Sequence, residues 1–290
     1  MNFENEYLQH SVIKQEKDIE KKELFAQTTV YINAGGRGTH LESIFPKCST
    51  GITKALINFI DKPMVQSHID LLSKFGFKNV VVGAGDHLDV KKYFEGKIDD
   101  KLNVASAEVC EGTGGDLIKA VRESNNFGRN VLVENVDTIL YVKSLDELLL
   151  WHKKNNAAAT IVLTTRKGVP NEGAFFVDKD NRVIFSREAD PAHELVEPEK
   201  WAGFRGSSTG VVVFNIDTLR SYNWQPGSNS LSIYRDIIPE LIKSSNLYAY
   251  NNENNLFIDT GMPSRYHQAK RHEKKLFGAV GKRYDEQINK

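Results

Sequence analysis

Thr28-Thr-Val-Tyr-Ile-Asn-Ala-Gly-Gly-Arg-Gly-Thr-His-Leu41 is an apolar, β-branched run that breaks into three glycines within four residues. Thr28–Ile32 has the β-branched and aromatic content of a short strand. The three glycines permit backbone torsions closed to other residues and leave the backbone amides open to a ligand. Such a loop can wrap a polyphosphate, with Arg37 and His40 as further N–H donors, although a plain tight turn explains the glycines equally well.

The composition is that of an ordinary soluble globular chain. Of 290 residues, 40% are hydrophobic and 26% are charged, which suits one large α/β domain or two small ones. Lysine plus arginine and aspartate plus glutamate number 38 each, so the charge balance gives no reason to expect nucleic acid or an anionic membrane as partner. No apolar run is long enough to span a bilayer. A small, locally charged ligand is the better expectation.

The ends of the chain and its cysteines bear on organisation and location. Cys48 and Cys110 are isolated and the N-terminus lacks a signal peptide's apolar core, which favours a reducing, cytoplasmic setting. We interpret residues 1–26 as an N-terminal extension, helical or frayed, 27–270 as a single domain, and 271–290 as a basic C-terminal helix or tail. The extension offers a surface to a second subunit, so a homo-oligomer stays open.

Strand, loop and helix signals alternate after the glycine loop. A long polar loop leads to Lys54, and the apolar run Ala55–Ile60 predicts a strand. Pro63 begins a predicted helix that Gly76 ends, and Asn79–Gly83 is typical of a buried strand. This pattern predicts a parallel α/β sheet with ligands bound at the carboxyl ends of its strands.

Two further features suggest a site at that edge of the sheet. The glycine turn Glu111–Asp116 opens a predicted helix, where its amides either face a flat base or sugar or simply cap the helix. Asp137 and Asp259 each end a predicted strand, and two such carboxylates can share one Mg²⁺. Taken singly, each aspartate is more often a cap or turn residue. The pair gains weight because a bound polyphosphate needs a counter-ion.

From about Val30 to Lys270 the chain resembles the sugar-1-phosphate nucleotidyltransferases, the family of sugar-nucleotide pyrophosphorylases. Six motifs in the family's order carry the likeness, and together they are far more specific than any one alone. The resemblance rests on the glycine signature Ala34–Leu41, the signature-lysine segment Thr53–Leu56 ahead of Asp61–Met64, the base-recognition turn Gly112–Gly115, the metal-aspartate segments Glu134–Thr138 and Phe257–Pro263, and the sugar-contacting strand Ser208–Phe214. It implies a Rossmann-like, mixed, mostly parallel sheet flanked by helices, the GT-A-like fold of nucleotide-diphospho-sugar transferases.

The resemblance also implies a reaction of nucleotide-sugar biosynthesis, with Mg²⁺ as cofactor. A sugar or cyclitol 1-phosphate attacks the α-phosphorus of a nucleoside triphosphate in line, and pyrophosphate leaves. No general base is required, because the second pKa of a phosphate monoester is about 6 and the nucleophile is already ionised. The barrier is then alignment and charge neutralisation, which positioned cations and amides supply. The pattern is most similar to branches that make GDP-linked sugars, such as mannose or heptose 1-phosphate guanylyltransferases, and to relatives acting on cyclitol phosphates. GTP is therefore favoured, with thymidylyl and uridylyl branches open.

The same resemblance implies a role for each candidate residue. Lys54, Arg37 and Asp137 are expected to be catalytic, and the metal is expected on Asp137 and Asp259. The nucleotide is expected to contact Ala34, Gly35, Gly36, Gly38, Thr39, His40, Gly112, Thr113 and Gly114. The sugar phosphate is expected to contact Glu172, Gly173, Arg187, Thr209 and Gly210.

The chain also departs from the family pattern. His40 stands where the family usually has arginine, and an imidazole with a reference pKa near 6.5 is only partly charged at neutral pH. Val136 replaces a glycine beside Asp137, and Arg187 stands in for a lysine that commonly binds the sugar phosphate. The first departure keeps open a non-catalytic homologue that binds a nucleotide or sugar phosphate and regulates. A metal-dependent GT-A glycosyltransferase is the other alternative, which the glycine loop and the distant Asp259 disfavour.

Overall fold

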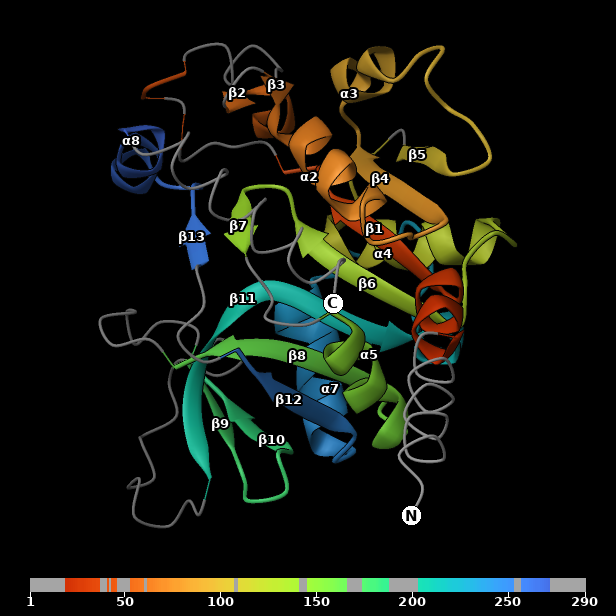
Figure 1. Cartoon of the computed structure of the whole chain (residues 1–290), viewed down its shortest axis with the longest axis vertical. Coiled ribbons are helices and arrows are strands. Elements are labelled where there is room, and N and C mark those ends of the chain that lie inside the picture. Colours follow the sequence, from red (N-terminus) through yellow and green to blue (C-terminus); the bar gives the residue numbers. More distant parts are fainter. Residues whose placement is uncertain are drawn as a thin grey trace, which may run out of the picture.

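The structure is a computed structural model that describes residues 19–36, 41, 43–45, 53–59, 62–106, 109–140, 145–165, 174–187, 203–252 and 257–271. Its first strand, β1 (Thr28–Asn33), lies inside the central sheet, as its β-branched sequence predicts (Figure 1). Every residue of β1 except the last is buried. Such continuous burial is typical of a strand that is covered on both faces.

Within the described residues, nine strands form the central sheet. Besides β1 they are β4 (Asn79–Gly85), β5 (Leu102–Ser106), β6 (Asn130–Asn135), β8 (Ala159–Thr164), β9 (Ala174–Val177), β10 (Val183–Ser186), β11 (Phe204–Asn215) and β12 (Leu247–Asn251). The order is β10-β9-β11-β6-β1-β4-β5, and β8 pairs with both β11 and β12. β6, β1, β4 and β5 are parallel, whereas β11 joins β6 antiparallel, so the sheet is mixed around a parallel centre.

Helices cover both faces of this sheet (Figure 1). One layer contains a helix over residues 19–26, α2 (Met64–Ser73), α3 (Leu88–Tyr93), α5 (Leu145–Lys154) and α8 (Pro263–Arg271). The opposite layer contains α4 (Gly112–Glu123), α6 (Ile216–Arg220), a π-helical turn η5 (Ile233–Ile237) and α7 (Ile238–Lys243). Val30 and Ile32 face the first layer and Tyr31 faces the second, which is the alternation of a strand between two cores. The predicted α/β fold class is therefore confirmed.

The segment after Lys54 differs from its prediction. Ala55–Ile60 was expected as an apolar strand, but the chain forms a 3₁₀ turn, η3 (Lys54–Leu56), and then the two-residue strand β2 (Asn58–Phe59), which pairs with β3 (Lys62–Pro63). Burial explains the apolar pattern without a sheet, because Ala55 and Phe59 pack fully buried into the hydrophobic core. The prediction relied only on the hydrophobicity of the run Ala55–Ile60. The structure of this segment is set instead by its short length and by the Thr53 cap at the start of η3.

The helix over residues 19–26 shows that the region before β1 contributes to the core. Leu24 and Phe25 are only 4% and 3% exposed, and they pack beneath the same layer as α2. The ring of Phe25 contacts Phe77 edge-on, with 5.0 Å between ring centroids. The final turns of the predicted extension thus belong to the packed body of the protein. Among the described residues, no helix has the length and apolar character needed to cross a membrane.

A second small sheet brings two distant segments to the carboxyl edge of the main sheet. β7 (Thr138–Leu140) follows β6 after a short turn and pairs antiparallel with β13 (Phe257–Asp259). In this register Asp259 lies opposite Thr138. The chain then enters α8, which packs on the first layer through Tyr266 and Ala269. Asp259 is thereby placed beside the end of β6.

Candidate active site

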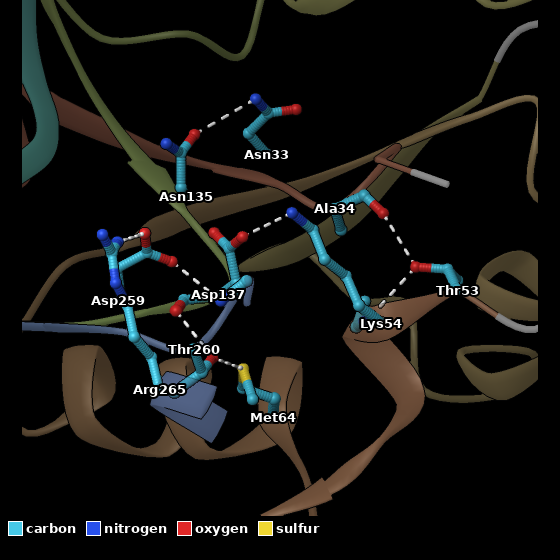
Figure 2. Close-up of polar contacts among 12 residues, drawn as sticks. Asn33, Ala34, Thr53, Lys54, Met64, Asn135, Asp137, Asp259, Thr260 and Arg265 are labelled. Carbon is cyan, nitrogen blue, oxygen red and sulfur yellow. Dashed lines mark hydrogen bonds and ion pairs between the residues drawn. The ribbon is translucent and has the colours of Figure 1, made fainter. Parts of the chain in front are cut away.

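Asp137 and Asp259, the two predicted metal-binding aspartates, meet at one glycine. The backbone N–H and the hydroxyl of Thr260 both donate to the Asp137 carbonyl oxygen, at 2.8 and 2.7 Å, which fixes the two segments together (Figure 2). A Cβ atom built on Gly261 would lie 2.8 Å from Asp137 Oδ2 and 3.0 Å from Asp259 Oδ1. Both carboxylates therefore border the same position, which Gly261 keeps free of a side chain.

Lys54 links these carboxylates to the glycine loop. Its Nζ lies 2.5 Å from Asp137 Oδ2, and the two side chains are only 19% and 14% exposed. A Cβ atom on Gly36 would lie 3.1 Å from Lys54 Cε, so the lysine runs directly beside the loop backbone. The predicted lysine, aspartate and loop are thus brought together by the fold (Figure 2).

Thr53 holds the backbone that carries Lys54, and our sequence reasoning assigned it no role of its own. Its buried hydroxyl accepts from Ala55 N at 3.0 Å and donates to the Ala34 carbonyl oxygen at 3.2 Å. Its own N–H donates to Asp89 Oδ2 at 3.0 Å. These bonds join the start of η3 to the end of β1. A threonine just before a helical turn is a capping signal that could have identified it.

Arg265 is a second cation at the site that our sequence reasoning missed. Its Nη1 lies 2.5 Å from Asp259 Oδ2, while Gly261 N donates to Asp259 Oδ1 at 2.7 Å. Both oxygens of this carboxylate are therefore engaged. No local pattern marks Arg265, because a charged residue on the first turn of a helix is common on protein surfaces.

The middle of β11, around Gly210, borders the same edge of the sheet. Gly210 has a φ of +79°, and a Cβ atom there would lie 2.9 Å from Asn135 Nδ2 and 3.2 Å from Thr138 Oγ1. Asn135 Oδ1 in turn accepts from Asn33 Nδ2 at 3.2 Å (Figure 2). Gly210 is thus required by a left-handed backbone and by close packing. The neighbouring Thr209 is buried, and its hydroxyl donates to the Val162 carbonyl oxygen at 2.9 Å.

The predicted base-recognition turn opens α4 beside the glycine loop. Gly112 has a φ of +85°, and the amides of Gly114 and Gly115 donate to the Leu231 carbonyl oxygen at 2.8 and 3.3 Å. Thr113 Oγ1 accepts from Ile233 N at 3.1 Å. The turn therefore makes the contacts that join α4 to η5.

Gly85 connects the start of α4 with the glycine loop. A Cβ atom on Gly85 would lie 3.3 Å from both Gly35 Cα and Asp116 Oδ2. Burial is the main reason that the pKa of Asp116 is raised. The loop thus has Lys54 on one side and the first turn of α4 on the other.

The remaining predicted residues are less closely tied to this site. Arg187 follows β10, where its N–H donates to the Ala174 carbonyl oxygen at 2.9 Å. In the described part of the chain, no hydrogen bond or ion pair joins Arg187 to Lys54, Asp137 or Asp259. The predicted site residues outside the described ranges are Arg37, Gly38, Thr39, His40, Glu172 and Gly173.

A half-buried ion pair lies behind the aspartates. His68 Nδ1 on α2 is 2.8 Å from Glu134 Oε1 on β6. Burial alone would lower the pKa of His68, but the charge and hydrogen bond of Glu134, together with Val136 and the charge of Asp137, raise the pKa above its ordinary value. The pair ties α2 to the strand that leads into Asp137.

Comparison with known proteins agrees with this geometry. The family profile described as "Nucleotidyl transferase" matches residues 30–275. The chain belongs to the nucleotidyl transferase family. This family membership confirms the resemblance carried by the six motifs.

Individual members of the nucleotidyl transferase family are distant in sequence. The mannose-1-phosphate guanyltransferase of Gibberella zeae is 24% identical over 239 residues, which cover 81% of this chain and 61% of that protein. The UTP–glucose-1-phosphate uridylyltransferase of Synechocystis sp. is 24% identical over 254 residues, which cover 82% of this chain and 61% of that protein. This nucleotidyl transferase chain thus spans about three fifths of the length of the curated relatives it matches.

Among solved structures, HddC from Yersinia pseudotuberculosis is similar to this nucleotidyl transferase. The TM-score is 0.61 at 20% sequence identity, over 84% of this chain and 98% of HddC. The complex of HddC with GMP-PN is also similar, with a TM-score of 0.58. The likeness confirms the fold.

Proposed function

We propose that this chain transfers a nucleotidyl group from GTP to a sugar or cyclitol 1-phosphate. A phosphate oxygen of the sugar phosphate forms a bond to the α-phosphorus, and the bond from that phosphorus to the β-phosphate oxygen breaks to release pyrophosphate. The observation that carries the proposal is the meeting of Lys54, Asp137 and Asp259 beside the glycine loop. These residues come from three separate segments, and their convergence at the carboxyl edge of a parallel sheet is typical of a ligand site.

The two aspartates fit the proposed Mg²⁺ ion in their chemistry. Mg²⁺ is usually held by one or two carboxylates, with substrate phosphates and water completing its shell. Asp137 and Asp259 supply two carboxylates on either side of Gly261, and within the described residues no larger group of His, Cys, Asp and Glu side chains is suited to a metal. When bound there, the ion would neutralise charge on the phosphates during transfer.

The residues of the chain itself would mainly align two anions. Lys54 provides a positive charge between the loop and Asp137, where an α-phosphate or sugar phosphate would lie. Gly35 and Gly36 carry no side chains of their own, so a phosphate could approach their backbone amides closely and accept hydrogen bonds from them. Fixed donors of this kind contribute through orientation and charge stabilisation, and they need no proton transfer.

The choice of GTP and of a mannose-like or cyclitol substrate rests on similarity. A named guanyltransferase and a GMP-PN complex support guanine, whereas the named uridylyltransferase supports UTP as the competing base. The decisive experiment measures pyrophosphate release with Mg²⁺, each common nucleoside triphosphate and a panel of sugar and cyclitol 1-phosphates. We expect release with GTP and one phosphate partner, and loss on chelation of the metal.

Variants make this experiment specific to the site. Lys54→Met and Asp137→Asn should each reduce turnover by about 100-fold or more. Lys62→Met is the matched control, because Lys62 pairs with Asp70 on the surface, where its side chain is 46% exposed. If no pair turns over while a nucleotide still binds, the transferase proposal is wrong and a non-catalytic homologue becomes the better description.

A further inference from the structure

Arg265 places a second fixed positive charge at the paired aspartates. The Arg265 and Asp259 side chains, joined at 2.5 Å, are 43% and 32% exposed. Lys54 engages Asp137 at the same distance and is more deeply buried. Figure 2 shows that Lys54 lies on the Ala34 side of the site, whereas Arg265 reaches Asp259 from α8. The two cations thus approach the carboxylates from different elements.

A divalent cation bound at the aspartates would change the charge balance between the two carboxylates and the two cations. Asp137 Oδ2 and Asp259 Oδ2 are the oxygens that Lys54 and Arg265 occupy. A metal held by the two carboxylates would compete with Lys54 and Arg265 for their negative charge and would repel both cations. Once the metal has entered, the two carboxylates no longer neutralise Lys54 and Arg265, and the site as a whole becomes positive. Such a site attracts phosphate groups.

Asp259 is held in place by contacts that do not involve Arg265. Gly261 N already donates to Asp259 Oδ1 at 2.7 Å, and the backbone pairing of β13 with β7 already positions this residue. Arg265 also lies in the first turn of α8, which begins at Pro263, where the positive end of the helix dipole disfavours a cation. Asp259 is the anion that offsets this cost, and a bound phosphate group could take its place.

We propose that metal binding releases Arg265 from Asp259 and that Arg265 then binds the phosphate of the attacking sugar or cyclitol phosphate. The inference rests on the proposed function. Lys54 lies beside Gly36, so its side of the site is expected to take the nucleoside triphosphate. Arg265 is on the α8 side and is exposed enough to turn toward a second substrate. Its planar guanidinium can donate two hydrogen bonds to one phosphate, which suits the role.

The test compares two substitutions with a control on the same helix. Arg265→Gln removes the charge, and Arg265→Lys keeps the charge but loses the planar pair of donors. Arg271→Gln is the control, because Arg271 lies exposed at the last residue of α8. KM is measured for each substrate of the active pair, and Mn²⁺ affinity is measured by electron paramagnetic resonance of the free ion without substrates.

We expect Arg265→Gln to shift the two readouts in opposite directions. The KM for the sugar phosphate should rise about tenfold or more while the KM for the triphosphate changes less than about twofold. Mn²⁺ should bind several-fold more tightly, because a competing cation is gone. Arg265→Lys should recover only part of the sugar-phosphate affinity, and Arg271→Gln should resemble the wild type.

Three results would overturn the inference. If Arg265 only orients Asp259, Arg265→Gln weakens Mn²⁺ binding together with both substrates. If Arg265 serves the triphosphate, the KM for the triphosphate rises instead. If both KM values and the Mn²⁺ affinity are unchanged in Arg265→Gln, Arg265 binds neither substrate and does not compete with the metal. If the wild type turns over no pair, the proposed function fails separately, and binding of inorganic phosphate to the Mn²⁺-loaded protein by calorimetry still decides whether Arg265 is a phosphate ligand.

Discussion

Lys54 Nζ lies 2.5 Å from Asp137 Oδ2, and this ion pair joins the glycine loop to the proposed metal side of the site. The pair is largely shielded from water, since the side chains are 19% and 14% exposed. In such surroundings, an ion pair contributes little net stability while intact, but removing one partner leaves an unpaired charge that costs several kcal/mol.

The Lys54–Asp137 pair should show strong coupling in a double-mutant cycle. We expect Lys54→Met and Asp137→Asn to have a coupling free energy of about 1–3 kcal/mol in urea unfolding without metal. The exposed Lys62–Asp70 pair is the internal control and should couple by less than about 1 kcal/mol, because solvent screens it. Equal coupling in the two pairs would contradict the burial argument.

Gly261→Ala should impair metal binding without unfolding the protein. The added Cβ would lie 2.8 Å from Asp137 Oδ2 and 3.0 Å from Asp259 Oδ1, so the carboxylates must move apart. The φ of Gly261 is not positive, so alanine fits the backbone. We expect Mn²⁺ affinity to fall about tenfold, comparable with the loss of a ligand-orienting contact. Ser264→Ala, on the exposed side of α8, should leave the affinity unchanged.

Thr53→Ala should affect stability and activity together. The substitution removes the hydroxyl that caps Ala55 N and donates to the Ala34 carbonyl oxygen in a fully buried position. We expect a loss of about 1–2 kcal/mol in urea unfolding and reduced pyrophosphate release, because Lys54 loses its support. Thr53→Ser retains the hydroxyl and should restore most of both. If Thr53→Ser loses as much stability and pyrophosphate release as Thr53→Ala, the methyl group of Thr53 is responsible, and the hydroxyl is not.

His152 should make the protein less stable at mildly acidic pH. The residue is 3% exposed, and burial lowers its pKa to about 4. An unfolded histidine titrates near 6.5, so between these pH values only the unfolded chain binds the proton. The contribution of His152 is therefore complete above pH 6.5 and is lost as the pH falls toward 4, by at most about 3 kcal/mol.

The measurement for His152 is the free energy of urea unfolding from pH 7 to pH 4. We expect a shallower decline for His152→Gln than for the wild type, because glutamine takes up no proton in this pH range. Glutamine can also keep a hydrogen bond to Thr160 Oγ1, which lies 2.9 Å from His152 Nδ1. His267→Gln changes an exposed histidine and should keep the wild-type slope. A parallel decline in all three proteins would show that His152 does not cause the effect.

Much of the fold was predictable because its signals are local. The β-branched run of β1, the Pro63–Gly76 boundaries around α2 and the apolar strand β4 all appear where their residue patterns indicate. The placement of the two aspartates at strand ends was predictable for Asp259, which ends β13, whereas Asp137 lies two residues beyond the end of β6, in the turn before β7. The strand expected after Lys54 failed because an apolar run of this length also suits a buried turn.

The α/β class and the family could be read from the amino-acid sequence, which also singled out Lys54, Asp137 and Asp259 as candidates, because strand pattern, glycine turns and motif order are encoded in adjacent residues. The hydrogen bonds by which Thr53 fixes the backbone of Lys54, and the ion pair of Arg265 with Asp259, appear only in the folded chain. These contacts depend on the pairing of β7 with β13 and on the packing of η3 against β1. Such distances between remote segments are set by the whole fold, and no local pattern records them.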